Sequence, residues 1–310
     1  MESSTASRPR SGLLPLARGF NVTKGLSYGF TFVAVGTLLF MLVLFCWQSV
    51  PVWRHEGFHY LIGKRWFYRE AVFGMLPMVY GTAVVSIIAL LLATPIGIGA
   101  AIFSSEFLPP RVRFAVKITI ELLAGIPSVV YGLLGILFLR NWMYQLLTPF
   151  DPLSGDSLLT AGVLLAVMVL PTIMTLSDDA LHGVPAAQRL AARGLGLTRT
   201  ETMLFTVLPQ ARRGIFAAVL LALGRALGET IAVFLVVGRQ DNRWPENLLS
   251  PQLWIESGQT LTSKLGGSET NIAYGDPLHW AAIIGLGLVL LVIVAVVTFA
   301  GARLEARRDA

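Results

Sequence analysis

Apolar residues gather in six long stretches, and polar segments separate each stretch from the next. The stretches cover residues 29–50, 76–103, 114–139, 158–176, 214–237 and 279–301. An α-helix needs roughly 20 mostly apolar residues to cross about 30 Å of hydrocarbon, and the stretches are of about that length or longer. The pattern therefore predicts an all-α fold, a polytopic membrane helix bundle with about six transmembrane helices.

The composition and the placement of positive charge fit a membrane protein. Hydrophobic residues make up 55% of the 310 residues and charged residues only 14%. The net charge of +6 could indicate a nucleic-acid partner, but Lys and Arg follow the topology instead. Alternate polar segments carry 14 of them on the side of both termini and 8 on the other side. Positive residues concentrate in cytoplasmic segments, so we expect cytoplasmic termini, contact with membrane lipids and no nucleic-acid partner.

This topology divides the chain into successive segments. We expect a cytoplasmic tail over 1–28, the first transmembrane helix over 29–50, a periplasmic loop over 51–75, a core of five transmembrane helices over 76–301 and a cytoplasmic tail over 302–310. Within the core, 178–213 is the longest cytoplasmic segment and 238–278 is a long periplasmic loop. Prolines inside the core helices remove a backbone donor and favour kinks; they are Pro95, Pro127 and Pro171.

Two charged residues, Arg225 and Glu229, fall near the middle of the stretch 214–237. Each costs at least about 2.5–3.5 kcal/mol at the centre of a membrane unless it is paired or hydrated. Their spacing of four residues lets them neutralise each other on one helix face, and Gly224 and Gly228 allow another backbone to approach closely. The pair is either a structural lock between helices or part of a water-lined substrate pathway. An arginine there would suit an oxyanion such as phosphate or carboxylate.

A second charged pair, Lys117 and Glu121, lies near the start of the stretch 114–139. The two residues are also four apart, so they share a helix face and can pair. Alternatively, Lys117 extends to the lipid headgroups and Glu121 only accompanies it.

The cytoplasmic segment 178–213 is predicted to contain two short helices separated at 194–197. The run Thr198-Arg199-Thr200-Glu201 has the spacing of a capping box, which would start the second helix. We expect that helix to end near Pro209 and its apolar face to need a partner, either the bundle or another protein.

The same segment resembles the EAA loop of the permeases of ABC importers. The resemblance is carried by Leu190-Ala191-Ala192, by Gly196 four residues later, and by Leu208-Pro209. Two positions depart from the family pattern, since Leu190 stands in place of the usual Glu and Thr206 in place of the usual Ile. Blocks over 122–132 and 222–230, and Tyr80-Gly81-Thr82 leading into 95–103, are similar to the phosphate-specific (Pst) permeases. The stretch 260–265 and the length of its loop favour the PstC type over the PstA type.

This resemblance implies a fold, an activity and a set of partners. It implies the MetI-like fold and a permease that passes inorganic phosphate across the bacterial inner membrane. It also implies a second permease of the PstA type, two cytoplasmic ATPase subunits of the PstB type and a periplasmic phosphate-binding protein. Residue by residue, it places Arg225 and Glu229 in the substrate pathway and Ala191, Ala192, Gly196, Leu208 and Pro209 in the loop that couples to the ATPase. Sulfate, molybdate and phosphonate remain open alternatives, because only the family blocks distinguish phosphate from them.

A rival function comes from His55-Glu56-Gly57-Phe58-His59, which matches the H-E-x-x-H pattern of zinc metalloproteases. On a helix the two imidazoles would share one face and bind zinc, with Glu56 as the base. Gly57 in the middle costs such a helix about 1 kcal/mol relative to Ala, and the topology offers no third ligand. We therefore expect an interfacial loop without a metal.

The sequence indicates no enzymatic chemistry of its own. It lacks the G-x-x-x-x-G-K-[ST] pattern that binds ATP phosphates. We expect no cofactor, and ATP hydrolysis in a separate subunit.

Overall fold

The computed structural model describes residues 22–244 and 254–306. The basic residues Arg8, Arg10, Arg18, Arg307 and Arg308, which contribute to the predicted orientation, lie outside these ranges. By its internal contacts the chain divides into two units, 1–44 and 45–310. The first described element, α1 (Val22–Glu56), begins in the first unit and ends in the second.

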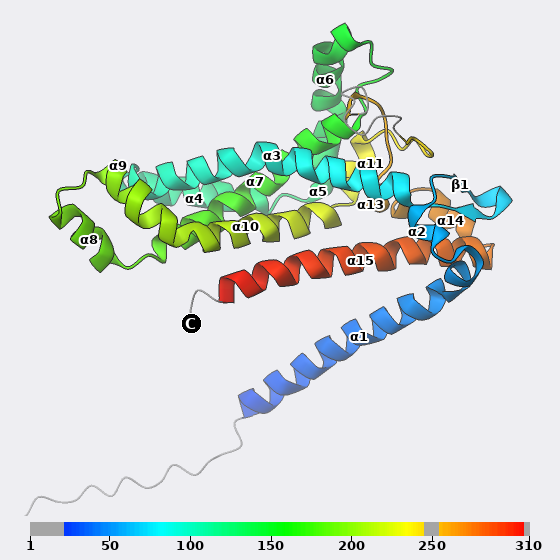
Figure 1. Cartoon of the computed structure of the whole chain (residues 1–310), viewed down its shortest axis with the longest axis horizontal. Coiled ribbons are helices and arrows are strands. Elements are labelled where there is room, and N and C mark those ends of the chain that lie inside the picture. The colour runs from blue at the N-terminus through cyan, green and yellow to red at the C-terminus, as the bar shows by residue number, and fades with distance from the viewer. Residues whose placement is uncertain (1–21, 245–253, 307–310) are drawn as a thin grey trace, which may run out of the picture. The chain divides into compact units, whose positions relative to one another are not determined.

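Long apolar helices dominate the second unit (Figure 1). They are α3 (Leu76–Glu106), α7 (Leu158–His182), α10 (Leu208–Gly228) and α15 (Pro277–Ala306). Together with α1, the described residues hold five helices long and apolar enough to cross a membrane, or six when a bent pair is counted as one span. The prediction of an all-α bundle with about six transmembrane helices is confirmed.

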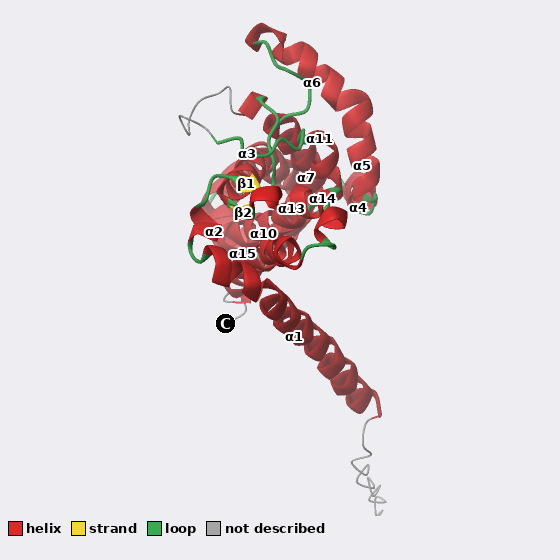
Figure 2. Ribbon diagram, turned by 90° about the vertical axis from the view of Figure 1, so that its right-hand side faces the viewer, coloured by secondary structure: helices red, strands yellow, loops and turns green. Residues whose placement is uncertain are grey.

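The third apolar stretch is not one helix, and the prediction of a continuous span over 114–139 is wrong. The chain forms α4 (Pro110–Ala124) and α5 (Ser128–Leu134), which continues through a π turn (Gly135–Leu139) into α6 (Arg140–Leu147) and the short η3 (Thr148–Phe150). The axis turns by 87° at the break. Helix α5 packs against α11 (Ile231–Val236), and α6 leads away from the other helices (Figures 1 and 2). Pro127 has an extended backbone and restricts the residue before it, so the predicted kink becomes a complete break.

The fifth apolar stretch is also interrupted. Helix α10 ends at Gly228, Glu229 has an extended backbone (φ −71°, ψ 119°), and α11 (Ile231–Val236) follows. At its other end α10 is longer than predicted, because α9 (Arg199–Thr202) runs through a π turn (Met203–Val207) directly into it. The expectation that the second helix of the segment 178–213 ends near Pro209 is therefore wrong. Proline has no backbone N–H to donate, and the π turn just before Pro209 lets the helix continue through this position.

Close contact between α3 and α7 forms the main core. Ile88, Leu165, Val169 and Ile173 are buried there. Small residues permit the approach: a β-carbon on Gly162 of α7 would lie 2.6 Å from Cγ2 of Ile88 on α3. The two helices therefore form the rigid centre against which α10 packs.

A compact cap, defined as residues 57–75, 238–244 and 254–276, covers one end of the helices. It contains α2 (His59–Ile62), β1 (Trp66–Phe67), η1 (Tyr68–Glu70), β2 (Val72–Phe73), α13 (Leu261–Leu265) and α14 (Glu269–Ala273). The strands pair antiparallel, with Trp66 opposite Phe73. This small hairpin was not predicted.

Ionic contacts hold the cap together around Lys264, whose side chain is 2% exposed. Its Nζ lies 2.7 Å from Oδ2 of Asp241 and also pairs with Glu269. Trp66 Nε1 donates to Glu269 at 2.5 Å, and His279 Nε2 lies 2.8 Å from the same oxygen. Burial by itself would raise the pKa of Glu269. The hydrogen bond and positive charge of Lys264, together with the hydrogen bonds from Trp66 and His279, outweigh burial and hold the pKa below the ordinary value.

Replacing Gly162 by Ala should wedge α3 and α7 apart. Overpacking of this kind lowers the free energy of unfolding by about 1–3 kcal/mol. Gly99→Ala is the matched control, because nothing lies within 4 Å of a β-carbon built there. Unfolding in detergent measures both; equal stability of the two variants would contradict the close approach.

Candidate functional site

Arg225 lies in the last turn of α10, with its side chain exposed on the surface of this chain. Its Nη1 donates to Oγ1 of Thr172 on α7 at 3.0 Å. Its Nη2 points to the carbonyl oxygen of Ala124 at 3.5 Å. Three helices that are distant in sequence therefore meet at this guanidinium.

The contact with Ala124 falls at the end of α4. The last four carbonyls of a helix lack intrahelical partners, and here they find them at the break before α5. The Gly125 amide donates to the carbonyls of Glu121 and Leu122, and Tyr131 Oη donates to that of Leu123 at 2.9 Å. Arg225 supplies the contact for the remaining carbonyl, so its position and the shape of the break depend on each other.

Glu229 does not pair with Arg225, so the predicted i,i+4 pair is wrong. Among the ion pairs of the described residues, none joins these two side chains. The physical reason is that α10 ends at Gly228, and an extended Glu229 no longer shares a helix face with Arg225. Their common role in a substrate pathway stays a prediction.

The two glycines beside this site differ in their surroundings. Gly224 is buried, and a β-carbon there would meet Oγ1 of Thr298 on α15 at 2.6 Å. Gly228 is exposed, with nothing within 4 Å of a β-carbon. The close approach expected at these glycines therefore occurs at Gly224, and the surface around Gly228 and Arg225 is open.

The exposed guanidinium of Arg225 is chemically suited to bind an oxyanion. A guanidinium has five N–H donors in a planar fork and stays charged, and here two of them point to neutral oxygens of this chain. Carboxylate and phosphate oxygens match that fork better than neutral oxygens do. The site can therefore accept an oxyanion in exchange for weaker contacts.

Lys117 does not pair with Glu121 either; its Nζ lies 3.3 Å from Oδ1 of Asp179 on α7. Beside it, Arg113 of α4 donates to Oδ2 of buried Asp178 at 2.9 Å. These contacts tie α4 to the end of α7. Sequence reasoning missed them because α7 continues to His182, six residues beyond the predicted end, and carries both aspartates with it.

The segment 178–213 contains the two predicted helices, and the predicted break between them is confirmed. Helix α8 (Ala186–Gly194) ends before Gly196, whose φ is +87°, and Thr198 and Glu201 form the predicted capping box at the start of α9. Of the residues expected to couple, Ala191 and Gly196 are exposed and Ala192 is buried. Leu208 and Pro209 lie instead in the first turn of α10.

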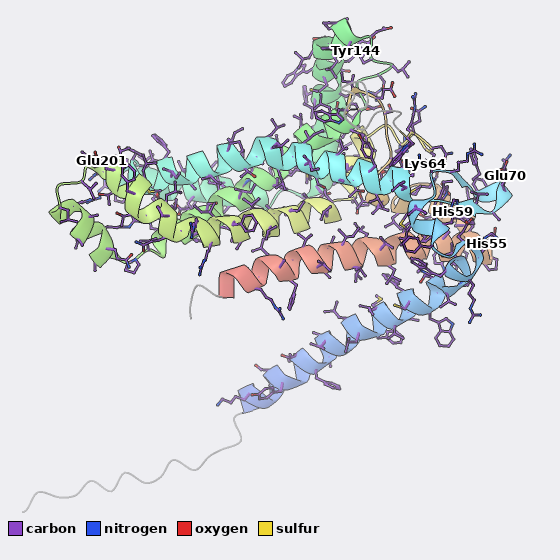
Figure 3. The ribbon with its side chains drawn as sticks, viewed as in Figure 1. His55, His59, Lys64, Glu70, Tyr144 and Glu201 are labelled. Carbon is purple, nitrogen blue, oxygen red and sulfur yellow. The ribbon has the colours of Figure 1, made fainter. Side chains whose placement is uncertain are left out.

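The H-E-x-x-H motif does not lie on one helix. α1 ends at Glu56, Gly57 has φ +55°, and His59 begins α2 (Figure 3). Glu56 Oε1 accepts a hydrogen bond from the Phe73 amide at 2.9 Å. In the described part of the chain, no group of three or more His, Cys, Asp or Glu is placed to hold a metal ion.

Comparison with known proteins decides the family. The family model described as "Binding-protein-dependent transport system inner membrane component" matches residues 93–310. The chain belongs to this family. Among curated relatives, the Phosphate transport system permease protein PstC of Mesorhizobium japonicum is 35% identical over 298 residues, covering 90% of this chain and 88% of the relative. PstC 1 of Mycobacterium tuberculosis is 38% identical over 241 residues, covering 72% and 69%.

Solved structures show the same fold at lower identity. A bacterial alginate ABC transporter matches with a TM-score of 0.60 at 15% identity, covering 92% of this chain and 96% of that chain. The inward-facing MetNI methionine ABC transporter matches with a TM-score of 0.56 at 17% identity, covering 75% and 95%. The expected MetI-like permease fold and the resemblance to PstC-type permeases are both confirmed.

Double-mutant cycles can test the contacts of Arg225. The cycle of Arg225→Gln with Thr172→Val should give a coupling energy of about 0.5–1.5 kcal/mol in the free energy of unfolding. The matched cycle of Arg225→Gln with Glu229→Gln should give a coupling below about 0.3 kcal/mol, as for residues without contact. A larger coupling energy for Arg225 with Glu229 than for Arg225 with Thr172 would contradict the structure and support the Arg225–Glu229 pair.

Proposed function

We propose that this chain is the transmembrane permease subunit of an ATP-driven importer of inorganic phosphate in the bacterial inner membrane. In this proposal both termini, with the tails 1–28 and 302–310, lie in the cytoplasm. A periplasmic binding protein delivers phosphate to the cap, and the anion then passes along the face of α10 that carries Arg225.

The exposed guanidinium of Arg225 carries the proposal. It lies in the last turn of α10, and the apolar stretch continues beyond it through α11. A charged side chain facing lipid there is costly, so water or another subunit must cover this face in the working assembly. A second permease, of the PstA type, would enclose Arg225 in a cavity between the two subunits.

Phosphate is supported as the substrate by the relatives named PstC, which are at least 35% identical to this chain in the two cases above. The chemistry of the site agrees, because a guanidinium fork matches tetrahedral oxyanions. Attraction must be strong enough to admit the anion and weak enough to release it. When phosphate arrives, Arg225 would give up its contacts with the Thr172 and Ala124 oxygens, and it would regain them when phosphate leaves. The regained contacts would make release of the anion easier. Glu229, beside the break, would offset the charge of Arg225 when no anion is bound.

The energy source must be a separate protein. Two cytoplasmic ATPase subunits of the PstB type would dock on the exposed face of α8 and on the loop around Gly196. Ala191, Ala192, Gly196, Leu208 and Pro209 would form the coupling segment. Movement of this segment would alternate access to the site between the two sides of the membrane.

Uptake of radiolabelled phosphate by vesicles with the assembled transporter tests the proposal. Arg225→Gln should lower uptake at least about 100-fold, because a neutral amide forfeits a charge-assisted interaction of a few kcal/mol. Arg213→Gln is the matched control, an exposed arginine on the same helix, and should import normally. Both variants should still co-purify with the ATPase subunits.

Competition identifies the anion among the alternatives. Excess unlabelled phosphate should abolish uptake, whereas sulfate, molybdate and phosphonate at the same concentration should leave most of it. Normal uptake by Arg225→Gln would refute the role of Arg225. Stronger competition by sulfate or molybdate would make this chain the permease of that oxyanion instead.

A further inference from the structure

Helix α8 makes little apolar contact with the rest of the chain. Of its nine residues only Ala192 is buried. Leu190, at the position where the family pattern has an acidic residue, is 67% exposed. The following helix is attached differently, because Met203 and Val207 are buried against Ala101 of α3 and Leu181 of α7. Hydrophobic packing thus anchors α9 and α10, and α8 needs another link.

Arg189 provides that link. Its Nη1 forms an ion pair with Oε1 of Glu106, the last residue of α3. Its Nη2 donates to the carbonyl oxygen of Leu181, in the last turn of α7, at 2.8 Å. The side chains are only 20% and 8% exposed, so water screens the pair less than it screens a surface salt bridge. One side chain of α8 therefore contacts the ends of both helices of the core.

The neighbouring charges are engaged elsewhere. Arg113 contacts Asp178 and His182, and Lys117 contacts Asp179. Within the described residues, Arg189 is the one cation that forms a salt bridge with Glu106. Loss of Arg189 would leave a nearly buried carboxylate uncompensated.

We propose that the Arg189–Glu106 ion pair, called the strut below, transmits displacement of α8 to α3 and α7. Arg189 is then a positioning residue for coupling. It stiffens the connection between the surface that an ATPase pushes and the core pair α3 and α7, of which α7 contacts Arg225 through Thr172. A planar fork with two simultaneous partners fixes direction as well as distance, which a single apolar contact at Ala192 does not. The inference rests on the proposed function, because it presumes an ATPase that acts on α8.

The transport test uses the assembled transporter in vesicles and measures ATP hydrolysed per phosphate imported. Arg189→Met and Glu106→Gln should each raise this ratio about fivefold or more, while the ATPase subunits still co-purify. The unfolding temperature should fall more in Arg189→Met, which leaves the nearly buried Glu106 carboxylate unpaired, than in Glu106→Gln. The exchanged double variant, Arg189→Glu with Glu106→Arg, should lower the ratio below that of either single variant, because the ion pair returns; recovery should be partial, because a carboxylate at 189 cannot donate to the Leu181 carbonyl. Arg212→Met is the control, an exposed arginine in the first turns of α10, and should leave the ratio unchanged.

A second measurement needs no transport. Hydrogen exchange of the α8 amides should accelerate about fivefold in Arg189→Met, the factor expected for loss of roughly 1 kcal/mol. Exchange within α7 should not change. Unaltered exchange in α8 would show that Arg189 does not anchor this helix.

The outcomes separate the two proposals. Absence of phosphate uptake by the parent complex would refute the proposed function, and α8 exchange would still decide whether the strut exists. Normal coupling in both single variants, or no recovery in the exchanged variant, would overturn the strut while leaving the phosphate importer intact.

Discussion

A positive charge that cannot be neutralised within its own helix governs the architecture around the site. Arg225 ends an apolar helix, and Glu229, the nearest acid in sequence, is directed away by the end of that helix at Gly228. The guanidinium instead contacts the oxygens of Thr172 and Ala124, on two other helices. Neutral oxygens only partly compensate a cation in an apolar surrounding, and the proposed function supplies the missing compensation with an anion.

Broken helices make that arrangement possible. At the break between α4 and α5, an amide of the break itself bonds the carbonyls of Glu121 and Leu122, and the Ala124 carbonyl has its contact from Arg225 of another helix. The break after α10 takes Glu229 out of the helix that holds Arg225. The surrounding core is the opposite in character, because α3 and α7 pack closely through small residues such as Gly162. The helix breaks lie beside a closely packed pair of helices, and the ion pair at Arg189 links that pair to α8.

The sequence predicts what depends on local pattern and misses what depends on contacts across the chain. The starts of α3 and α7 at Leu76 and Leu158 agree with the apolar stretches, and the capping box at Thr198 is present. The Arg225–Glu229 pair was wrong because its spacing argument assumes an unbroken helix. The contact between Arg189 and Glu106 joins residues 83 positions apart, which no periodicity reveals. Pro127 marked the third stretch for a kink, but the sequence does not show the 87° bend or the contacts that Arg225 and Tyr131 make beside it.

The central claim is that the face of α10 around Arg225 borders a water-filled substrate pathway. Accessibility of a cysteine at Gly228 tests it, in a Cys46→Ser background that removes the one native cysteine. Gly228 has open space for the new side chain. In vesicles with the assembled transporter, a membrane-impermeant thiol reagent should modify Gly228→Cys, and phosphate should slow the reaction while sulfate does not. Modification only by membrane-permeant reagents, at a rate that phosphate does not alter, would show a lipid-facing surface and contradict the account.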